Sequence, residues 1–455
     1  MLNPNSLEAR DIESVIHPYT NLDRHREVGP LVLDRGEGCY LYDSEGKEYL
    51  EGVAGLWCTA LGYGEKELVK AATEQMEKLS FSHLFLGRSH EPVIALAEKL
   101  KELSPIDTAR VFFVGSGSGA NDTAIKLIWY YNNAIGRPEK KKIIGRMKAY
   151  HGVTVASASV GGLPINHTDW DVPLPGFLHT ECPHHYRVAE ADESHEDFAT
   201  RMAEMLEQLI LRAGPETVAA MFAEPVQCAG GLIIPPETYF PKIQAVLKKY
   251  DVLLVADEVI TGFQRTGNYW GCQTYDMQPD MITCAKALSS AYLPIGAVTV
   301  PSYMHDAMID QSTKIGSLGH GNTYAGHPVC AAVALRTLEI YEERNILDHV
   351  RSIIPGFQER LATFADHPLV GEARLGAGLM GGVELVEDKA TKKAFDPKRI
   401  IGLKTLEACQ RHGLMVRAIG DVIALCPPLI ITEDQIDSLF DRFSAALDEI
   451  EKTEV

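Results

Sequence analysis

Five short apolar runs, separated by longer stretches, recur between residues 111 and 285. The runs lie at 111–114, 141–146, 218–223, 252–256 and 281–285. Because they lack polar alternation, they predict strands that are covered on both faces, as in a parallel sheet. Stretches with helical periodicity follow the first and third runs, at 121–135 and 239–250. Strand, helix and strand in this succession indicate an α/β fold with a mostly parallel central sheet.

The two ends of the chain have a different pattern. Residues 1–60 read as loops and short strands, including a hairpin in LYDSEGKEYL (41–50). Helical periodicity begins at 65–79 and 91–103. Beyond residue 325, helical patterns and strands alternate at 328–344, 371–386, 399–413, 414–419 and 432–451. We therefore expect a large domain over 61–325 and a smaller α+β domain over 326–455, which the segment 1–60 completes.

Composition narrows the class of protein. The 455 residues carry 43 Lys and Arg against 62 Asp and Glu, a formal net charge of −19. This balance disfavours nucleic acid or an anionic membrane as the main partner. No apolar run approaches a membrane span, and the polar N-terminus does not resemble a signal or transit peptide. Nine cysteines without a C-x-x-C pair indicate reduced thiols, so we expect a cytoplasmic protein.

A turn rich in glycine and serine, GSGSGA (115–120), separates the first apolar run from the helix that follows it. Its spacing fits the dinucleotide fingerprint, and it equally fits any phosphate held at a helix N-terminus. A dinucleotide site expects an acidic residue at the end of the next strand. That strand ends instead in Arg146, which suits only a 2′-phosphate. The dinucleotide alternative is therefore the weaker of the two.

Three later runs are each followed directly by charge: Glu224, Asp257 with Glu258, and Lys286. In open parallel sheets, ligands bind beyond the carboxyl ends of the strands. Pyridoxal phosphate (PLP) requires a desolvated lysine for a Schiff base and a carboxylate beside its ring nitrogen. Lys286 and Asp257 suit these two roles. The backbone at Gly117 and Ser118 then offers the phosphate site, so this pattern favours PLP chemistry over a dinucleotide.

Eight motifs make the chain resemble a class III, fold-type-I PLP aminotransferase, and most closely the amine–pyruvate omega-transaminases. The motifs are GLWCTALGYG (55–64), GSGSGAND (115–122), AYHGVT (149–154), AEPVQCAGG (223–231), DEVITGFQRTG (257–267), AKALSSAYLPIGA (285–297), GHGNTYAGHPV (319–329) and VRAIGD (416–421). The resemblance covers nearly the whole chain, and together the motifs are very specific.

The resemblance implies a role for each matching residue. Lys286 is the catalytic lysine that binds PLP and then transfers the proton, and Asp257 pairs with the pyridine nitrogen. The other implied cofactor contacts are Ser116, Gly117, Ser118, Tyr150, His151, Glu224 and Val259, with Thr323 supplied by the other subunit. A threonine that reaches the neighbouring site implies an obligate homodimer with shared active sites, and a tetramer is left open.

Substrate selection is expected from a different set. Arg417 resembles the mobile arginine that binds a substrate carboxylate, and a guanidinium can do so bidentately. The implied pocket residues are Tyr19, Leu56, Trp57, Phe85, Tyr150 and Ala229. Four positions depart from the family pattern, namely Gly119, Cys228, Gln264 and Asn322. These four departures leave the residues of the core chemistry unchanged, and we expect them to affect which substrates the protein accepts.

No metal site is expected. The segment HTECPHHYR (179–187) gathers three histidines and a cysteine, but it lacks the second ligand pair of a zinc site. The sequence thus predicts a PLP-dependent transaminase that moves an amino group from a primary amine or ω-amino acid to pyruvate. An aminomutase or decarboxylase on the same scaffold, and a PLP-binding protein without turnover, are the alternatives.

Overall fold

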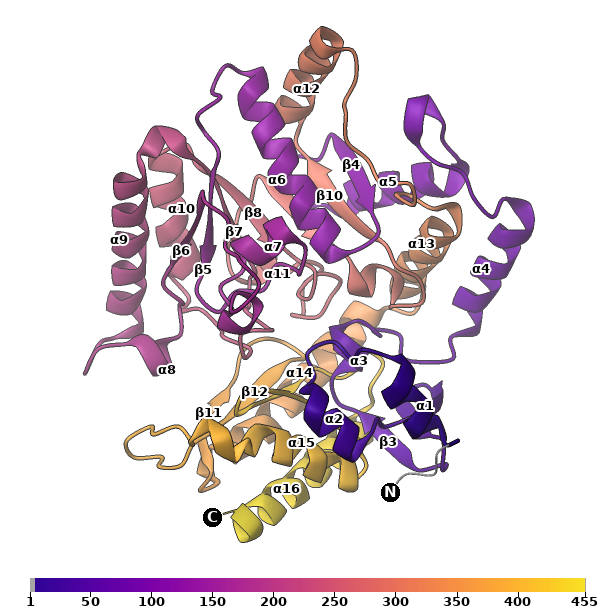
Figure 1. Ribbon diagram of the computed structural model, residues 1–455, viewed down its shortest axis with the longest axis vertical. Helices are drawn as coiled ribbons and strands as arrows, with labels where there is room; N and C mark the ends of the chain where they lie inside the picture. Colours follow the sequence, from indigo (N-terminus) through magenta and orange to yellow (C-terminus); the bar gives the residue numbers. More distant parts are fainter. Residues whose placement is uncertain (1–4, 455) are drawn as a thin grey trace.

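The computed structural model describes residues 5–454 and contains a seven-stranded sheet with two four-stranded sheets beside it. The large sheet has the order β4-β10-β9-β8-β7-β5-β6. Its strands are β4 (Arg110–Val114), β5 (Lys142–Arg146), β6 (Phe177–Thr180), β7 (Val218–Ala223), β8 (Leu253–Asp257), β9 (Met281–Cys284) and β10 (Gly296–Val300). All five apolar runs form strands of this sheet, which confirms the predicted α/β class (Figure 1).

One strand of the large sheet is antiparallel. β10 pairs antiparallel with both β4 and β9, whereas β5, β6, β7, β8 and β9 pair parallel to one another. Only residues 285–295 separate β9 from β10. A parallel return needs a crossover of a dozen or more residues, so this short connection requires a reversal of direction. Neither β10 nor β6 stood out among the apolar runs.

Both faces of the large sheet are covered. Neighbouring strand residues, such as Ile143 and Ile144, enter different hydrophobic clusters, because successive side chains point to opposite faces. One cluster contains α6 (Gly117–Ala134), which contacts α7 (Val155–Val160) and α12 (Ser302–Ile315). The other contains α4 (Lys66–Lys78), α5 (Glu91–Leu103), α9 (His195–Ala213), α10 (Tyr239–Lys249) and α13 (Pro328–Glu343).

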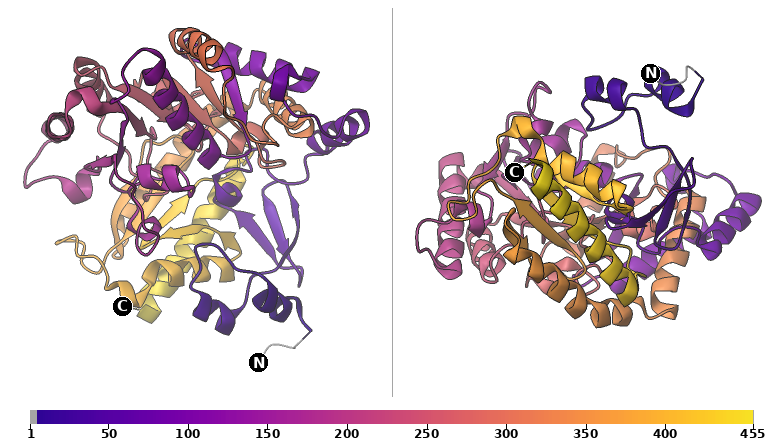
Figure 2. Two further views of the ribbon diagram at one scale, coloured as in Figure 1. Left: turned by 45° about the horizontal axis from the view of Figure 1, so that its top comes forward. Right: turned by 90° about the horizontal axis from the view of Figure 1, so that it is seen from below.

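The two ends of the chain lie side by side beneath the large sheet (Figures 1 and 2). One small sheet has the order β1-β2-β3-β13, and the other has the order β11-β12-β15-β14. These strands are β1 (Leu33–Glu37), β2 (Tyr40–Asp43), β3 (Glu48–Glu51), β11 (Val370–Arg374), β12 (Gly381–Leu385), β13 (Leu414–Met415), β14 (Arg417–Ile419) and β15 (Val422–Leu425). β2 and β3 form the predicted hairpin, and β3 pairs parallel with β13.

The C-terminal helices are α14 (Ile346–Ala362), α15 (Ile401–Arg411) and α16 (Glu433–Glu454). The sequence did not predict α14, because this helix contains Pro355 and Gly356, two residues that normally interrupt a helical pattern. Short helices complete the set: α1 (Leu7–Ser14), α2 (Leu22–Val28), α3 (Ala54–Trp57), α8 (His185–Val188) and α11 (Gly271–Thr274). The 3₁₀ helices are η1 (Phe85–Gly87), η2 (Pro164–Asn166), η3 (Pro215–Thr217), η4 (Lys286–Ser289), η5 (Thr363–Asp366) and η6 (Pro397–Arg399).

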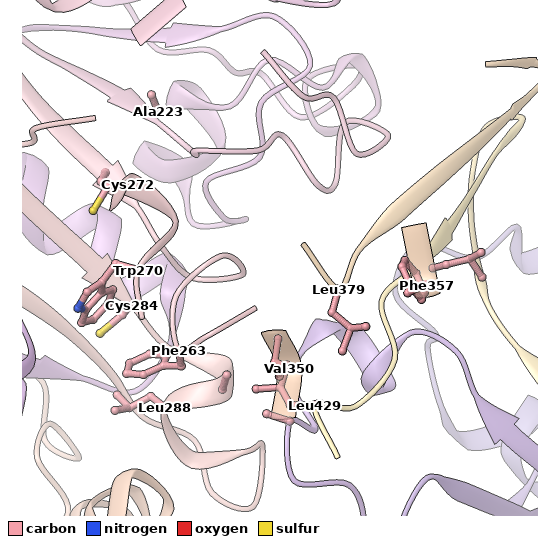
Figure 3. Packing of buried hydrophobic residues seen from close by; sticks show 14 of the residues in the cluster. Ala223, Phe263, Trp270, Cys272, Cys284, Leu288, Val350, Phe357, Leu379 and Leu429 are labelled. Atoms are coloured by element: carbon pink, nitrogen blue, oxygen red, sulfur yellow. The ribbon is translucent and has the colours of Figure 1, made fainter. Parts of the chain in front are cut away.

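One hydrophobic cluster joins the large sheet to the C-terminal helices. Figure 3 shows Phe263, Trp270 and Leu288 on one side of it and Val350 and Phe357 on the other. Because this apolar surface is continuous, the position of the smaller sheets relative to the large one is fixed by packing. Among residues 5–454, no helix is long and apolar enough to cross a membrane. All nine cysteines have free thiols.

Candidate active site

A cavity of about 720 Å³ lies at the carboxyl ends of β7, β8 and β9, between the large sheet and the small sheets. These three strands are neighbours in the sheet, so the charges that follow them meet at one edge. Glu224, Asp257 and Lys286 all line the cavity. Of the other residues expected from the sequence, only Phe85 and Thr323 do not line it; those that do are Tyr19, Leu56, Trp57, Ser116, Gly117, Ser118, Tyr150, His151, Ala229, Val259 and Arg417.

Asp257, the last residue of β8, is 4% exposed and held from three directions. Its Oδ2 accepts hydrogen bonds from Asn121 Nδ2 at 2.7 Å and from His151 Nδ1 at 2.8 Å. Its Oδ1 accepts from the backbone N–H of Val259 at 3.1 Å. Thr283 Oγ1 in turn donates to Asn121 Oδ1 at 2.9 Å. These bonds fix the carboxylate in one orientation.

Asn121 and Thr283 were absent from the sequence-based set. Asn121 lies in the motif GSGSGAND (115–122), one turn into α6. Its amide also donates a hydrogen bond to His151 O at 2.7 Å. Thr283 lies on β9, where it reads as an ordinary strand residue. Only the pairing of β8 with β9 brings it near Asp257.

Lys286 follows β9 and begins η4 with a left-handed backbone, φ +49°. Such a φ is uncommon for a residue with a side chain, and it accumulates at functional sites. Burial lowers the pKa of Lys286, although Cys58 and Asp257 act in the opposite direction. A lowered pKa favours the neutral, nucleophilic amine. The sequence-based expectation of a desolvated lysine therefore agrees with its surroundings.

The turn before α6 forms an anion site. Ser116 is the N-cap of α6, and its Oγ accepts from Gly119 N at 3.1 Å. The backbone at Gly117 and Ser118 opens the helix, where free N–H groups and the helix dipole favour a phosphate. A Cβ on Gly117 would lie 3.0 Å from both methyl groups of Val259, so glycine lets Val259 approach the turn.

A buried ion pair lies behind this wall of the cavity. Arg146 is fully buried, and its guanidinium donates to Glu224 Oε2 at 2.9 Å and to Glu224 O at 2.5 Å. Glu224 Oε1 accepts from the backbone N–H of Tyr150 at 3.0 Å. The pair therefore positions Tyr150 against the cavity. Arg146 forms its ion pair with Glu224 inside the protein, so its guanidinium is not placed to bind a 2′-phosphate. This arrangement argues against the dinucleotide alternative.

The opposite wall comes from the two ends of the chain. Arg417 on β14 lies with its guanidinium carbon 5.1 Å from the ring centroid of Trp57, and Lys286 Nζ lies 5.6 Å from the same centroid. Trp57 Nε1 and Arg417 Nε are buried without a hydrogen-bond partner among residues 5–454. Burial lowers the pKa of Arg417. A cation and a polar N–H without partners favour an anionic or polar ligand here.

Tyr19 and Tyr150 meet at the mouth of the cavity. Tyr19 OH donates to Asn166 Oδ1 at 2.8 Å, which connects the N-terminal segment to η2. Burial, together with the neighbouring Tyr19, raises the pKa of Tyr150 to about 12. The phenol of Tyr150 therefore stays protonated at neutral pH and serves as a hydrogen-bond donor rather than a base.

Phe85 and Thr323 lie together outside the cavity of their own chain. A Cβ on Gly321 would meet the Phe85 ring at 2.7 Å, so the ring packs on the loop that carries Asn322 and Thr323. Phe85 is 44% exposed, and both Asn322 and Thr323 are exposed. Within one chain, this surface contributes nothing to the cavity.

The remaining departures from the family pattern have different surroundings. A Cβ on Gly119 would meet nothing closer than 3.4 Å, so the space alone does not require glycine. Cys228 is buried with its Sγ 4.0 Å from Met380 Sδ. Gln264 is buried with φ +77°, a conformation that favours glycine.

The cavity fits PLP. Asp257 is a buried carboxylate that forms no ion pair with a lysine or arginine in the described chain, and a protonated pyridine nitrogen would supply the missing cation. The N-terminus of α6 would hold the phosphate, and Lys286 Nζ would bind the aldehyde carbon. Tyr150 and Val259 would cover the two faces of the ring.

Comparison with known proteins identifies the class. The family model for class-III aminotransferases matches residues 22–447. The chain is 51% identical to a thermostable six-fold mutant of an omega transaminase from Pseudomonas jessenii, with a TM-score of 0.96 over 98% of both chains. It therefore belongs to the class-III aminotransferases, which have the fold-type-I architecture and depend on PLP.

Other relatives refine the comparison. The Pseudomonas jessenii omega transaminase in complex with PMP is 50% identical, with a TM-score of 0.97 over 98% of this chain and 99% of that one. A probable mitochondrial gamma-aminobutyrate transaminase 3 from Oryza sativa subsp. indica is 51% identical over 95% of this chain and 85% of its own length. A chloroplastic gamma aminobutyrate transaminase 3 from Solanum lycopersicum is 49% identical over 98% and 87%, respectively.

Proposed function

We propose that this aminotransferase is an omega-transaminase that moves an amino group from a primary amine or an ω-amino acid to pyruvate, forming alanine. The observation that carries the proposal is the half-buried guanidinium of Arg417, which lies against the ring of Trp57 in a cavity that also holds Lys286. Such a cavity accepts a carboxylate at the arginine and an apolar group along the rings. The names of the rice and tomato relatives make 4-aminobutyrate a donor to test first.

Each residue contributes one function to this reaction. When bound, PLP supplies the electron sink that stabilises negative charge on the substrate carbon. Asp257 keeps the ring nitrogen protonated, and Asn121 and His151 hold Asp257 in place. Lys286 Nζ takes a proton from the substrate carbon, holds it, and gives it up again as the amino group is transferred. Arg417 binds the carboxylate of pyruvate or of an ω-amino acid and moves aside for an uncharged amine.

The active unit is proposed to be a homodimer with shared sites. The exposed loop with Thr323, and Phe85 packed on it, would complete the cavity of the partner.

The test of shared sites mixes Lys286→Ala chains with Thr323→Val chains. If Thr323 acts across the interface, one of the two sites in each heterodimer is intact, so activity returns. Activity that stays at the sum of the two parents would refute sharing. A tetramer remains a prediction for sedimentation analysis.

The domain division at residues 60 and 325 and the cytoplasmic location are also proposals. The division rests on the pairing of β3 with β13, which joins the first segment to the last. The location rests on the reduced thiols, whereas the names of the plant relatives place those proteins in mitochondria or chloroplasts. Fractionation of the native cell would decide between these compartments.

The deciding experiment is an absorbance spectrum of the holoenzyme before and after excess primary amine, β-alanine or 4-aminobutyrate, and then pyruvate. Loss of the visible cofactor band with a donor and its return with pyruvate would establish both half-reactions. A band that returns only with another keto acid would refute pyruvate as the acceptor. Release of carbon dioxide without pyruvate consumption would indicate a decarboxylase. A band that no donor changes would favour a PLP-binding protein without turnover.

A further inference from the structure

A cluster of two histidines and one aspartate holds the N-terminal segment together. Asp11 lies on α1, His17 follows α1, and His25 lies on α2. His17 Nε2 lies 2.7 Å and His25 Nε2 lies 3.1 Å from the same atom, Asp11 Oδ2. The two imidazole rings lie 4.3 Å apart. Three potential ligand atoms from three points of the chain thus converge within 4.8 Å of one another.

This segment has no hydrophobic core of its own. Neither α1 nor α2 contains a fully buried residue, and both lie at the edge of the molecule (Figures 1 and 2). The side chain of His25 is nevertheless only 9% exposed, because it faces Asp11 and His17. Small elements that lack a core are commonly held by a metal ion, whose binding free energy stabilises the folded arrangement.

We propose that Asp11, His17 and His25 bind a divalent transition-metal ion of the Zn²⁺ class, which links α1 to α2. Two neutral imidazole nitrogens and one carboxylate are typical ligands of zinc, with a water as the fourth. At a tetrahedral angle, these bond lengths place nitrogen and oxygen about 3.4 Å apart. Asp11 would therefore retreat by less than about 1 Å to admit the ion. His17 and Asp11 are 30% and 22% exposed, which leaves a path for entry.

Two other groups of histidine and acid are worse candidates. His367 lies 3.7 Å from Asp448 and 3.6 Å from Glu451, but its Nδ1 accepts from the backbone N–H of Leu369 at 3.2 Å. Its Nε2 therefore carries the ring proton and lacks a lone pair for a metal.

In the other group, Arg374 pairs with both acids near His184, which are Glu372 and Glu384. A metal there would have to displace a guanidinium. By contrast, no lysine or arginine in the described chain pairs with Asp11.

The site would also affect the cavity. Residues Pro18 and Tyr19 follow His17 directly and line the cavity, and Tyr19 has a left-handed backbone with φ +52°. An ion that fixes His17 would restrict the loop 15–21 and hold Tyr19 at the cavity mouth. The ion would thus act as a structural link outside the chemistry.

The test is equilibrium dialysis of the untagged, full-length holoenzyme against ZnCl₂, with metal content measured per chain. We compare wild type, His25→Ala and the double variant His17→Ala/His25→Ala, with His367→Ala as the matched control. Wild type and the control should retain one more zinc per chain than the two other variants. The cofactor absorbance of each variant reports whether it is folded.

Limited proteolysis of loop 15–21 gives a second readout that needs no turnover. Zn²⁺ should slow cleavage of this loop at least several-fold in wild type and in His367→Ala, and have no effect in the double variant. Equal zinc content in wild type and the double variant would overturn the proposal, and so would a wild type that binds no zinc. Either result would leave the proposed transaminase function unaffected.

Discussion

The inner and outer walls of the cavity are built differently. The inner wall, formed by the ends of β7, β8 and β9, holds Asp257 and Glu224 at low exposure through hydrogen bonds from α6 and from β5, respectively. The outer wall includes Tyr19 and Leu56, which are 53% and 47% exposed. The inner wall has one fixed arrangement, whereas the outer wall is open to solvent and to adjustment.

The origin of each wall in the chain explains this difference. The inner wall belongs to one sheet, whose backbone pairing fixes the strand ends to each other. The outer wall combines a loop after α1, the helix α3 and the strand β14, which belong to separate parts of the chain. Proton transfer requires atoms placed to within a fraction of an ångström, while a range of substrates requires a wall that can change. The comparison predicts large effects for inner-wall substitutions and selective effects for outer-wall ones.

The largest effect is expected for Lys286→Ala. The variant lacks the amine that binds the cofactor and transfers the proton, so activity should fall about 10³-fold or more, and the visible cofactor band should disappear. Rate assays and absorbance spectra measure both. Lys126→Ala is the control, because Lys126 is an exposed lysine that contacts His320. Full activity in Lys286→Ala would disprove the mechanism.

Glu224→Gln tests the rigidity of the inner wall. The substitution leaves the guanidinium of Arg146 buried without its counter-ion, which should lower the free energy of unfolding by about 3–5 kcal/mol. Denaturant titration measures this change. Glu196→Gln, which removes an exposed ion pair with Lys242, should cost less than about 1 kcal/mol. Similar losses in the two variants would show that the inner wall is no more constrained than the surface.

Acid should weaken the attachment of the sheet that carries Arg417. Burial lowers the pKa of His184 from 6.5 to about 4, and its Nε2 contacts Glu372 on β11 at 2.9 Å. His184 binds a proton more readily in the unfolded chain than in the folded one. The contribution of neutral His184 to the free energy of unfolding is therefore fully present above pH 6.5, and it is lost as the pH falls towards 4. The full loss is about 3 kcal/mol. Denaturant titrations of wild type and His184→Gln across this window check it; parallel curves would contradict the assignment.

Arg417→Leu should separate substrates by charge. Loss of the charge-assisted hydrogen bonds should raise KM for pyruvate and 4-aminobutyrate about 10- to 100-fold. The rate of the first half-reaction with an uncharged primary amine, measured from the loss of the cofactor absorbance band in the absence of pyruvate, should change little. Arg411→Leu, which removes a surface pair with Glu449, is the control. An equal loss for charged and uncharged donors would mean that Arg417 supports the wall rather than selects substrates.

The smallest effect is expected for Tyr19→Phe. The variant loses the hydrogen bond to Asn166, worth about 1 kcal/mol, so KM for amine donors should rise about five-fold with kcat unchanged. Steady-state kinetics measure both constants. Tyr42→Phe removes a comparable bond to Glu48 outside the cavity and should leave KM unchanged. A fall in kcat for Tyr19→Phe would indicate that the outer wall also positions the reacting atoms.

The sequence by itself determined five of the seven strands of the large sheet and the charges at its edge. The apolar runs ending near Glu224, Asp257 and Lys286 are strands because they are short, continuous and bounded by polar residues, all of which are local properties. The family and the cofactor followed from motifs that are each one contiguous stretch of the chain. The hairpin β2–β3 was equally readable, because its turn and both arms are contiguous.

Only the tertiary structure decided which distant residues meet. Thr283 reaches Asn121 because α6 packs against β9, and Arg146 reaches Glu224 because β5 and β7 pair. Neither contact leaves a trace in local periodicity. The reversal of β10 and the place of Phe85 outside its own cavity likewise depend on packing between separate segments. Hydrophobic pattern and turn residues specify local structure, whereas pairing across long sequence separations is selected by the free energy of the whole folded chain.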